Sequence, residues 1–192
     1  SSAASDVYKR QDYYSINTII ISELERLKVG RYHFIAIGGI GMSGLAKYLL
    51  EDGHTVSGSD IADSKYIDKL RELGAQVKIG HNEANLSDDT DIVVISTAIR
   101  ENNPELVKAR QLGIPVYHRS DLLEEIAKTA QQSGKCFIGF SGTHGKTTTS
   151  GLASFVLDKA GLEPSFVDGG IIPDINTNAQ PVSYTHLRAH ET

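Results

Sequence analysis

From residue 32 onward, short apolar runs alternate with longer stretches whose apolar residues recur at helical spacing. The apolar runs predict strands at residues 33–37, 55–57, 76–79, 91–96 and 115–117. The stretches between them predict helices, with apolar stripes formed by Leu45, Leu49 and Leu50, by Ile67, Leu70 and Leu73, and by Leu106, Val107, Ala109 and Leu112. Strands that alternate with helices are typical of the α/β class, in which helices cover a parallel sheet.

A further helix is expected where Leu122, Leu123, Ile126 and Ala127 recur at helical spacing, and Ser120 indicates its start as a cap. Periodicity is lost over residues 128–135, so we place a domain boundary there. We expect a first domain at residues 30–130 and the truncated start of a second at 135–181.

Glycines follow the first predicted strand in the sequence Gly-Gly-Ile-Gly-Met-Ser-Gly, residues 38–44. Gly39, Gly41 and Gly44 have the G-x-G-x-x-G spacing of a dinucleotide-binding loop, in which the third glycine lets the helix pack close to the strand. Asp60 ends the second strand, where an acidic group commonly binds a ribose hydroxyl. From spacing alone, NAD binding is favoured; the alternative is a tight turn without a ligand.

A second loop, Gly-Thr-His-Gly-Lys-Thr-Thr-Thr at residues 142–149, lies between an apolar run at 136–140 and an amphipathic stretch. The order strand, loop, helix is what a phosphate-binding loop requires. Backbone N–H groups and the helix N-terminus would hold phosphate oxygens, Lys146 would add a positive charge, and the Thr147 hydroxyl would ligate Mg²⁺. The pattern predicts an ATP site.

Composition narrows the classes of function. The net charge of -5 argues against broad affinity for nucleic acid or anionic membranes, and no apolar stretch is long enough to span a membrane. The single Cys136 cannot form an internal disulfide and lies in an apolar run, where we expect it to be buried. These features favour a cytoplasmic protein.

Both ends of the chain resemble translated sequencing adaptors, at residues 1–11 and 182–192, and we expect them to be non-native. The sheet needed to cover Leu152, Phe155 and Val156 is short of strands in the sequence given. We therefore expect residues 32–127 to fold alone and the remainder to be loose.

The phosphate loop has Phe140 where the general pattern has a glycine, and this shorter form resembles the Mur ligases, ATP-dependent enzymes of peptidoglycan precursor synthesis. Agreement extends to separated segments, namely residues 57–60, 80–81, 96–99 and 103–105, and Arg119. In that family the N-terminal domain is Rossmann-like yet holds the UDP part of the substrate. The resemblance thus implies UDP binding, rather than NAD binding, at the first loop.

The resemblance also implies which residues bind. For the UDP substrate they are Gly39, Ile40, Gly41, Met42, Ser43, Gly44, Ser59, Asp60, His81, Ser96, Thr97, Ala98 and Arg119. For ATP they are Gly142, Thr143, His144, Gly145, Lys146, Thr147 and Thr148, with Lys146 and Thr147 catalytic and Thr147 holding Mg²⁺.

Within the family, the first loop and residues 96–99 favour enzymes that add L-alanine to UDP-N-acetylmuramate through an acyl phosphate. The alternative is the ligase that recycles murein tripeptide, which shares the phosphate loop. The sequence given stops before the family's later acidic motif, metal-site histidine and C-terminal domain, so we expect it to be inactive alone. Outside the family, an NAD-binding regulatory module and a small kinase or motor-type ATPase remain open.

Overall fold

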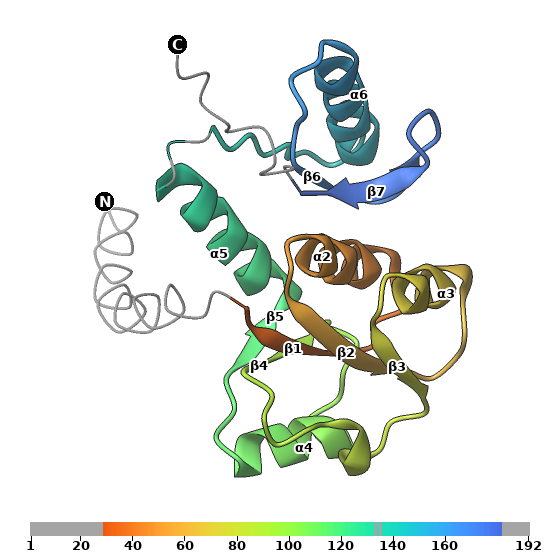
Figure 1. Cartoon of the computed structure of the whole chain (residues 1–192), viewed down its shortest axis with the longest axis vertical. Coiled ribbons are helices and arrows are strands. Elements are labelled where there is room, and N and C mark those ends of the chain that lie inside the picture. The colour runs from red at the N-terminus through yellow and green to blue at the C-terminus, as the bar shows by residue number, and fades with distance from the viewer. Residues whose placement is uncertain (1–28, 133, 135, 182–192) are drawn as a thin grey trace, which may run out of the picture. The chain divides into compact units, whose positions relative to one another are not determined.

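The computed structural model describes residues 29–132, 134 and 136–181. The adaptor-like ends at residues 1–11 and 182–192 lie outside the described residues. From Arg31 onward the chain forms one compact unit. It contains a five-stranded sheet in the order β3-β2-β1-β4-β5, and every pair of neighbouring strands is parallel (Figure 1). The strands are β1 (Arg31–Ile35), β2 (Thr55–Asp60), β3 (Gln76–Ile79), β4 (Ile92–Ile95) and β5 (Val116–His118).

Helices alternate with these strands, as the hydrophobic pattern predicts. They are α2 (Ile40–Glu51), α3 (Lys65–Glu72), α4 (Pro104–Gln111) and α5 (Arg119–Gln132), with a short 3-10 turn η2 (Glu83–Asn85). Figure 1 shows α2 and α3 on one face of the sheet and α4 on the other. Phe34 and Ile35 are therefore both fully buried although their side chains point to opposite faces. The α/β fold with a parallel sheet is confirmed.

The strand order reverses at β1, because β2 lies on one side of it and β4 on the other. Ligands of open α/β sheets bind outside the carboxyl ends of the strands at such a point. The loop at residues 38–44 leaves the carboxyl end of β1, so it lies where the fold favours a ligand.

In the described residues that follow α5, the regular elements are α6 (Lys146–Lys159) and an antiparallel hairpin of β6 (Phe166–Ile172) and β7 (Thr177–Gln180). On the α6 side, Ser150 Oγ donates to Asp168 Oδ1 at 2.9 Å. On the α2 side, Asn178 Nδ2 donates to the Ile40 carbonyl at 2.9 Å and Lys47 Nζ to the Ala179 carbonyl at 2.6 Å. The hairpin thus contacts both helices that follow a predicted nucleotide loop.

The prediction of a strand at residues 136–140 is wrong. This segment has no regular structure, and the side chains of Phe137, Ile138 and Phe140 are exposed. Cys136 is likewise exposed, not buried as expected. An apolar run becomes a strand only when a neighbour takes its backbone hydrogen bonds, and within the described residues β6 and β7 pair only with each other.

Three smaller expectations also differ. Helix α5 begins at Arg119, so Ser120 lies inside it, and Asp121 Oδ2 accepts from the His118 N–H at 2.9 Å. The same helix continues to Gln132, into the segment where periodicity is lost. Strand β2 extends to Asp60, beyond the predicted end at residue 57, because β1 and β3 both pair with it.

A membrane-spanning helix is absent from the part of the chain that the structure describes.

Candidate functional site

The glycine loop is held to the sheet by backbone hydrogen bonds. The N–H groups of Ala36 and Ile37 both donate to the Ser59 carbonyl, at 2.8 and 3.0 Å, and Ala36 adopts a φ of 67° as the chain leaves β1. Gly39 is the N-cap of α2 in an extended conformation, with no side chain over the helix end. The first N–H groups of α2 and its positive dipole end can therefore face an anion.

Arg119 lies directly against this loop. A Cβ atom built at Gly41 would be only 2.1 Å from Arg119 Nη1, so the guanidinium lies over this glycine and would have to move if the residue were larger. Arg119 is the first residue of α5 and is exposed, which leaves its guanidinium accessible. A guanidinium beside a glycine loop and a helix N-terminus is suited to a pyrophosphate, because each group favours negative charge. The structure therefore brings together two of the predicted UDP-site elements.

Both carboxylate oxygens of Asp60 accept hydrogen bonds from backbone N–H groups. Its Oδ2 accepts from the Gly38 N–H at 2.8 Å and its Oδ1 from the Ala62 N–H at 3.3 Å. These bonds hold the start of the glycine loop to the end of β2. Asp60 thus serves the loop's shape first, and the ribose contact expected from spacing stays a prediction.

Other predicted UDP-site residues face the interior. The side chains of Met42 and Ser43 are buried, and Ser43 Oγ donates to the Ile40 carbonyl at 3.1 Å. These residues can offer a ligand only their backbone. Gly44 also differs from expectation: a Cβ there would meet Asn178 Nδ2 at 2.9 Å, so the glycine makes room for the hairpin and not for β1.

Ser96, Thr97 and Ala98 follow β4 at the same edge of the sheet as the glycine loop. Ser96 Oγ accepts from the Ala98 N–H at 3.4 Å, and its carbonyl accepts from the Ile99 N–H at 3.2 Å. Thr97 and Ala98 are exposed. These residues border the point where the strand order reverses, and their contact with a pyrophosphate stays a prediction.

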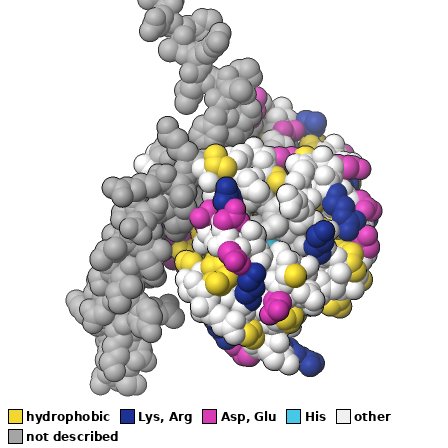
Figure 2. Space-filling model, turned by 60° about the horizontal axis from the view of Figure 1, so that its bottom comes forward, with side chains coloured by type: hydrophobic (Ala, Val, Ile, Leu, Met, Phe, Trp, Pro, Cys, Tyr) yellow, Lys and Arg dark blue, Asp and Glu magenta, His cyan; other side chains and the backbone are white. Residues whose placement is uncertain are grey.

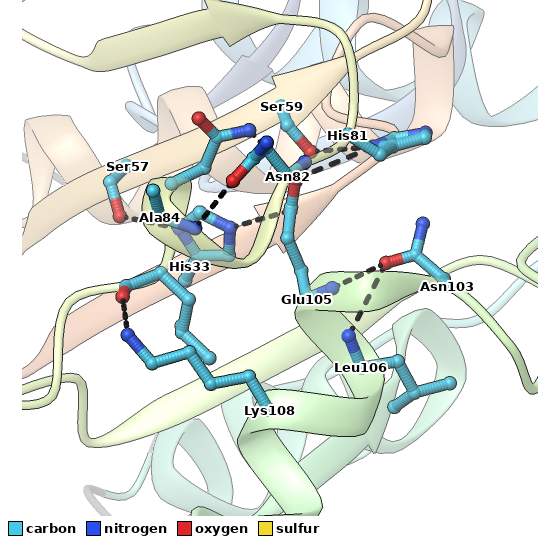
Figure 3. A network of polar contacts seen from close by, with 12 residues as sticks. His33, Ser57, Ser59, His81, Asn82, Ala84, Asn103, Glu105, Leu106 and Lys108 are labelled. Carbon is cyan, nitrogen blue, oxygen red and sulfur yellow. Dashed lines mark hydrogen bonds and ion pairs between the residues drawn. The ribbon is translucent and has the colours of Figure 1, made fainter.

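A buried polar network lies on the α4 side of the sheet, centred on Glu105 (Figure 3). Its Oε2 accepts from His33 Nε2 at 2.9 Å and from Ser59 Oγ at 2.6 Å. Its Oε1 accepts from the Asn82 N–H at 3.0 Å and from Asn85 Nδ2 at 2.9 Å. One carboxylate therefore joins β1, β2, α4 and the loop after β3.

The network extends in two directions. His33 Nδ1 lies 2.8 Å from Ser57 Oγ, and His81 Nδ1 lies 2.8 Å from Ser59 Oγ. The Ser59 side chain is fully buried and is turned to Glu105 and His81, not to solvent. Burial alone would raise the pKa of Glu105, but its hydrogen bonds from His33, Ser59, Asn85 and Asn82 together lower that pKa to about 2. Glu105 is therefore ionised at neutral pH.

Sequence reasoning noted residues 103–105 as part of a resemblance but assigned Glu105 and His33 no function. A signal was present at His33, a polar residue inside the apolar run of β1, because such a residue must find a buried partner. Glu105 gave no signal, since an acidic residue in the first turn of a helix is ordinary. Only the packing of α4 on the sheet identifies it as the partner of His33.

The phosphate loop is exposed over residues 141–149. Gly145 is the N-cap of α6 with a left-handed φ of 77°, which directs the chain into the helix. Lys146 Nζ donates to the Gly142 carbonyl at 2.5 Å and to the Thr143 carbonyl at 3.4 Å. An ammonium group folded over its own loop is near where phosphate oxygens would lie in a loop of this type.

Thr147 packs against β6. A Cβ at Gly170 would lie 2.9 Å from Thr147 Cγ2, and one at Gly169 would lie 3.2 Å from Thr147 Oγ1. Nearby, the buried Asp168 Oδ2 has no hydrogen-bond partner among the residues that the structure describes. Among the described residues no group of three or more His, Cys, Asp or Glu side chains could hold a metal ion. A metal ion held by the Thr147 hydroxyl would therefore not find a cluster of three such side chains in this part of the chain, and the phosphates of a nucleotide could supply further ligands.

Charges elsewhere on the surface are mixed. On the face drawn in Figure 2, basic and acidic side chains are interspersed. Ion pairs such as Arg71–Asp63 and Arg31–Asp89 likewise place opposite charges next to each other. An anion would therefore be attracted by the loops and helix ends, not by a broad basic patch.

Comparison with known proteins matches residues 31–131, more than half of the chain, to the family described as Mur ligase family, catalytic domain. The UDP-N-acetylmuramate--L-alanine ligase of Carboxydothermus hydrogenoformans is 47% identical over 168 residues, which is 88% of this chain and 34% of that protein. The enzyme of the same name from Rhizobium meliloti is 47% identical over 152 residues, 79% of this chain and 31% of that protein. The chain thus spans about a third of the length of these relatives.

Two solved structures are similar. The UDP-N-acetylmuramate-alanine ligase of Thermotoga maritima matches with a TM-score of 0.71 at 33% sequence identity. The match covers 79% of this chain and 35% of the chain of that enzyme. The UDP-N-acetylmuramate:L-alanyl-gamma-D-glutamyl-meso-diaminopimelate ligase of Neisseria meningitides has a TM-score of 0.71 at 29% identity, over 85% of this chain and 50% of its own.

Proposed function

The chain belongs to the Mur ligase family, and we propose that it carries two nucleotide-binding loops of an ATP-dependent ligase that joins L-alanine to UDP-N-acetylmuramate. The observation that carries this proposal is the presence in one chain of two different loops. One is a glycine loop with Arg119 against Gly41, and the other is the Gly-Thr-His-Gly-Lys-Thr loop at the start of α6. A reaction between two nucleotide-bearing substrates needs both.

The glycine loop would bind the UDP part of the substrate. The N-terminus of α2 and the Arg119 guanidinium would share the charge of the pyrophosphate. The carboxylate of Asp60 accepts from the Gly38 and Ala62 N–H groups and would hold the glycine loop in shape for the pyrophosphate. Binding energy from UDP, remote from the reacting carboxylate, would hold that carboxylate in place.

The second loop would bind ATP. Lys146 Nζ would exchange its bonds to the Gly142 and Thr143 carbonyls for phosphate oxygens, and the backbone N–H groups of residues 143–148 would share their charge. The donor set, an ammonium group, a hydroxyl and a helix N-terminus, fits a nucleotide with Mg²⁺ held at Thr147. The metal ion, when bound, would neutralise phosphate charge.

The reaction would then proceed in two steps. The lactyl carboxylate of UDP-N-acetylmuramate attacks the γ-phosphorus of ATP, so that an acyl phosphate forms and ADP leaves. The amine of L-alanine attacks the acyl carbon, phosphate leaves, and the amide forms with loss of the amine proton. Lys146 and the loop N–H groups act in the first step, because negative charge there moves from the γ- to the β-phosphate.

Two alternatives make different predictions. A ligase that recycles murein tripeptide would take the tripeptide in place of L-alanine. The relatives at 47% identity carry the alanine ligase name, and this favours L-alanine. An NAD-binding regulatory module would explain the glycine loop but would leave the loop at residues 142–148 without a ligand.

The test is an assay on the complete protein that contains this chain. Incubation with ATP, Mg²⁺ and UDP-N-acetylmuramate should release phosphate and form an amide only when L-alanine is added. Release with L-alanyl-γ-D-glutamyl-meso-diaminopimelate but not with L-alanine would assign the recycling reaction instead. No amide with either amine would contradict the ligase proposal.

A further inference from the structure

His81 is held in one tautomer by the buried network around Glu105. Ser59 Oγ lies 2.6 Å from Glu105 Oε2 and 2.8 Å from His81 Nδ1. Because Glu105 is ionised, its oxygens can only accept, so the single hydroxyl proton of Ser59 must point to Glu105. Ser59 Oγ can then only accept from His81, and Nδ1 must carry the proton.

This assignment leaves Nε2 of a neutral His81 ring as a hydrogen-bond acceptor directed away from Ser59. No bond in the network needs a second proton on the ring, since Glu105 already accepts from His33, Ser59, Asn82 and Asn85. Glu105 Oε1 also lies 3.6 Å from His81 Nδ1. The carboxylate therefore helps to hold the Nδ1 proton on the side of the ring that faces the sheet.

The same bonds fix where the ring lies. The Asn82 N–H donates to Glu105 Oε1, and the Gly80 N–H donates to the Asp60 carbonyl at 2.7 Å, so the backbone on both sides of His81 is anchored. Ser59 also accepts the Ala36 and Ile37 N–H groups at the start of the glycine loop. Ser59 thus connects two segments at the carboxyl edge of the sheet: its carbonyl holds the glycine loop and its hydroxyl holds His81.

We propose that Glu105, acting through Ser59, is a positioning residue of the UDP site that fixes His81 as the Nδ1–H tautomer, so that Nε2 accepts a hydrogen bond from an N–H or O–H of the uridine moiety. This inference rests on the proposed function. An acceptor nitrogen needs a donor, and the uridine offers N–H and O–H groups whereas the ionised pyrophosphate offers none. The role assigned to Glu105 explains why a carboxylate is buried among polar groups next to a binding edge.

The chain supplies a matched control. Ser57 lies two residues before Ser59 on β2, faces the same side of the sheet and belongs to the same network, but contacts His33 and not His81. Ser57→Ala and Ser59→Ala each remove one hydroxyl from the network. A purely structural role for the network predicts similar effects of both on ligand binding.

The experiment uses the 192-residue chain and has two readouts. Long-range ¹H–¹⁵N correlation spectra are recorded without ligand at about pH 8, where an unperturbed histidine is neutral. They report which ring nitrogen of His81 carries the proton. The His81 signals are assigned as those that are missing from the spectrum of His81→Ala. Calorimetric titration with UDP-N-acetylmuramate reports the Kd. Thermal unfolding is recorded for every variant.

We expect the protonated Nδ1 form in the wild type and in Ser57→Ala, and a mixture of tautomers in Ser59→Ala. Ser59→Ala should weaken binding about tenfold, the loss of one well-placed hydrogen bond, and Ser57→Ala should change it by less than about twofold. The double variant Ser59→Ala/His81→Ala should bind no more weakly than His81→Ala alone.

Unchanged spectra in Ser59→Ala, or wild-type affinity in Ser59→Ala or in His81→Ala, would overturn this inference while leaving the proposed function intact. If Ser59→Ala does not fold, His81→Ala and the wild-type spectrum still decide it. A wild-type chain that does not bind UDP-N-acetylmuramate would instead overturn the proposed function, together with the ligand contact assigned to His81.

Discussion

The two predicted nucleotide loops of this chain differ in how far the protein itself holds them. The glycine loop at residues 38–44 is tied to β2 through Ser59 and Asp60, is covered by Arg119, and follows a buried strand. The phosphate loop at residues 142–149 is exposed, and within the described residues its lysine bonds only to carbonyls of the same loop. The first loop is held in shape by the rest of the protein, whereas the second would gain most of its partners from a bound ligand.

This difference has a functional consequence. A preorganised loop loses little conformational entropy on binding, so UDP can provide affinity and position the substrate. A loop whose charged group is satisfied by its own backbone can exchange those bonds for phosphates and release them again after each turnover. We infer that the first site holds the substrate and the second performs the chemistry.

Hydrogen exchange on this chain measures the comparison directly and should show the largest contrast. The amides of Ile35, Ala36 and Ile37 lie in or beside a buried strand, whereas the side chains of Ile138, Leu152 and Val156 are more than half exposed. We expect at least about a hundredfold stronger protection for residues 35–37 than for residue 138 and residues 152–156. Equal protection of the two groups would remove the contrast on which this account rests.

Lys146→Ala tests the catalytic half. In the complete enzyme, ATP-dependent alanine ligation should fall by about a hundredfold to a thousandfold, because a charge that stabilises the transferring phosphoryl group is lost. The affinity for UDP-N-acetylmuramate should stay within a few-fold. Lys159→Ala on the same helix is the control, since that side chain is 60% exposed at the far end of α6, and it should keep near-normal activity. Near-normal activity in Lys146→Ala would remove the assignment of the phosphate loop.

Glu105→Gln tests the network that supports the first loop. The folded-state pKa of Glu105 is about 2, below its ordinary value of 4.5, so its contribution to stability is present above about pH 4.5 and is lost as the pH falls toward 2. The drop corresponds to about 3 kcal/mol. The stability difference between wild type and Glu105→Gln, measured by urea unfolding, should therefore shrink as the pH falls through that window.

Glu101→Gln is the control for that measurement. The Arg110 guanidinium also lowers the pKa of Glu101, but this carboxylate is exposed and its ion pair is screened by solvent. Its unfolding curves should follow those of the wild type closely at each pH. A stability difference for Glu105→Gln that is the same at every pH would show that the Glu105 charge contributes nothing.

The two regions also differ in how well the sequence predicts them. Periodicity identified all five strands of the parallel sheet to within a few residues, because each is a short apolar run between amphipathic helices. The same rule was wrong at residues 136–140, where the run has no neighbouring strand among the described residues. Periodicity describes which side chains prefer burial, and pairing depends on what the rest of the fold provides.

At the candidate sites, motif spacing predicted both loops but not the groups that hold them. Arg119 was predicted near the UDP site from a resemblance, and the structure places it against Gly41. The bonds from Ser59 to Glu105 and His81 were not predictable, because they join residues far apart in sequence across three elements. Hydrogen-bond direction within such a network follows only from knowing every partner.

The central claim is that the glycine loop binds a UDP-sugar and not a dinucleotide. Separate calorimetric titrations of this chain with UDP-N-acetylmuramate and with NAD test it most directly, because both ligands carry a pyrophosphate and differ in what flanks it. Our account predicts measurable binding of UDP-N-acetylmuramate at least about tenfold tighter than that of NAD, a difference of about 1.4 kcal/mol. Tighter binding of NAD would contradict it.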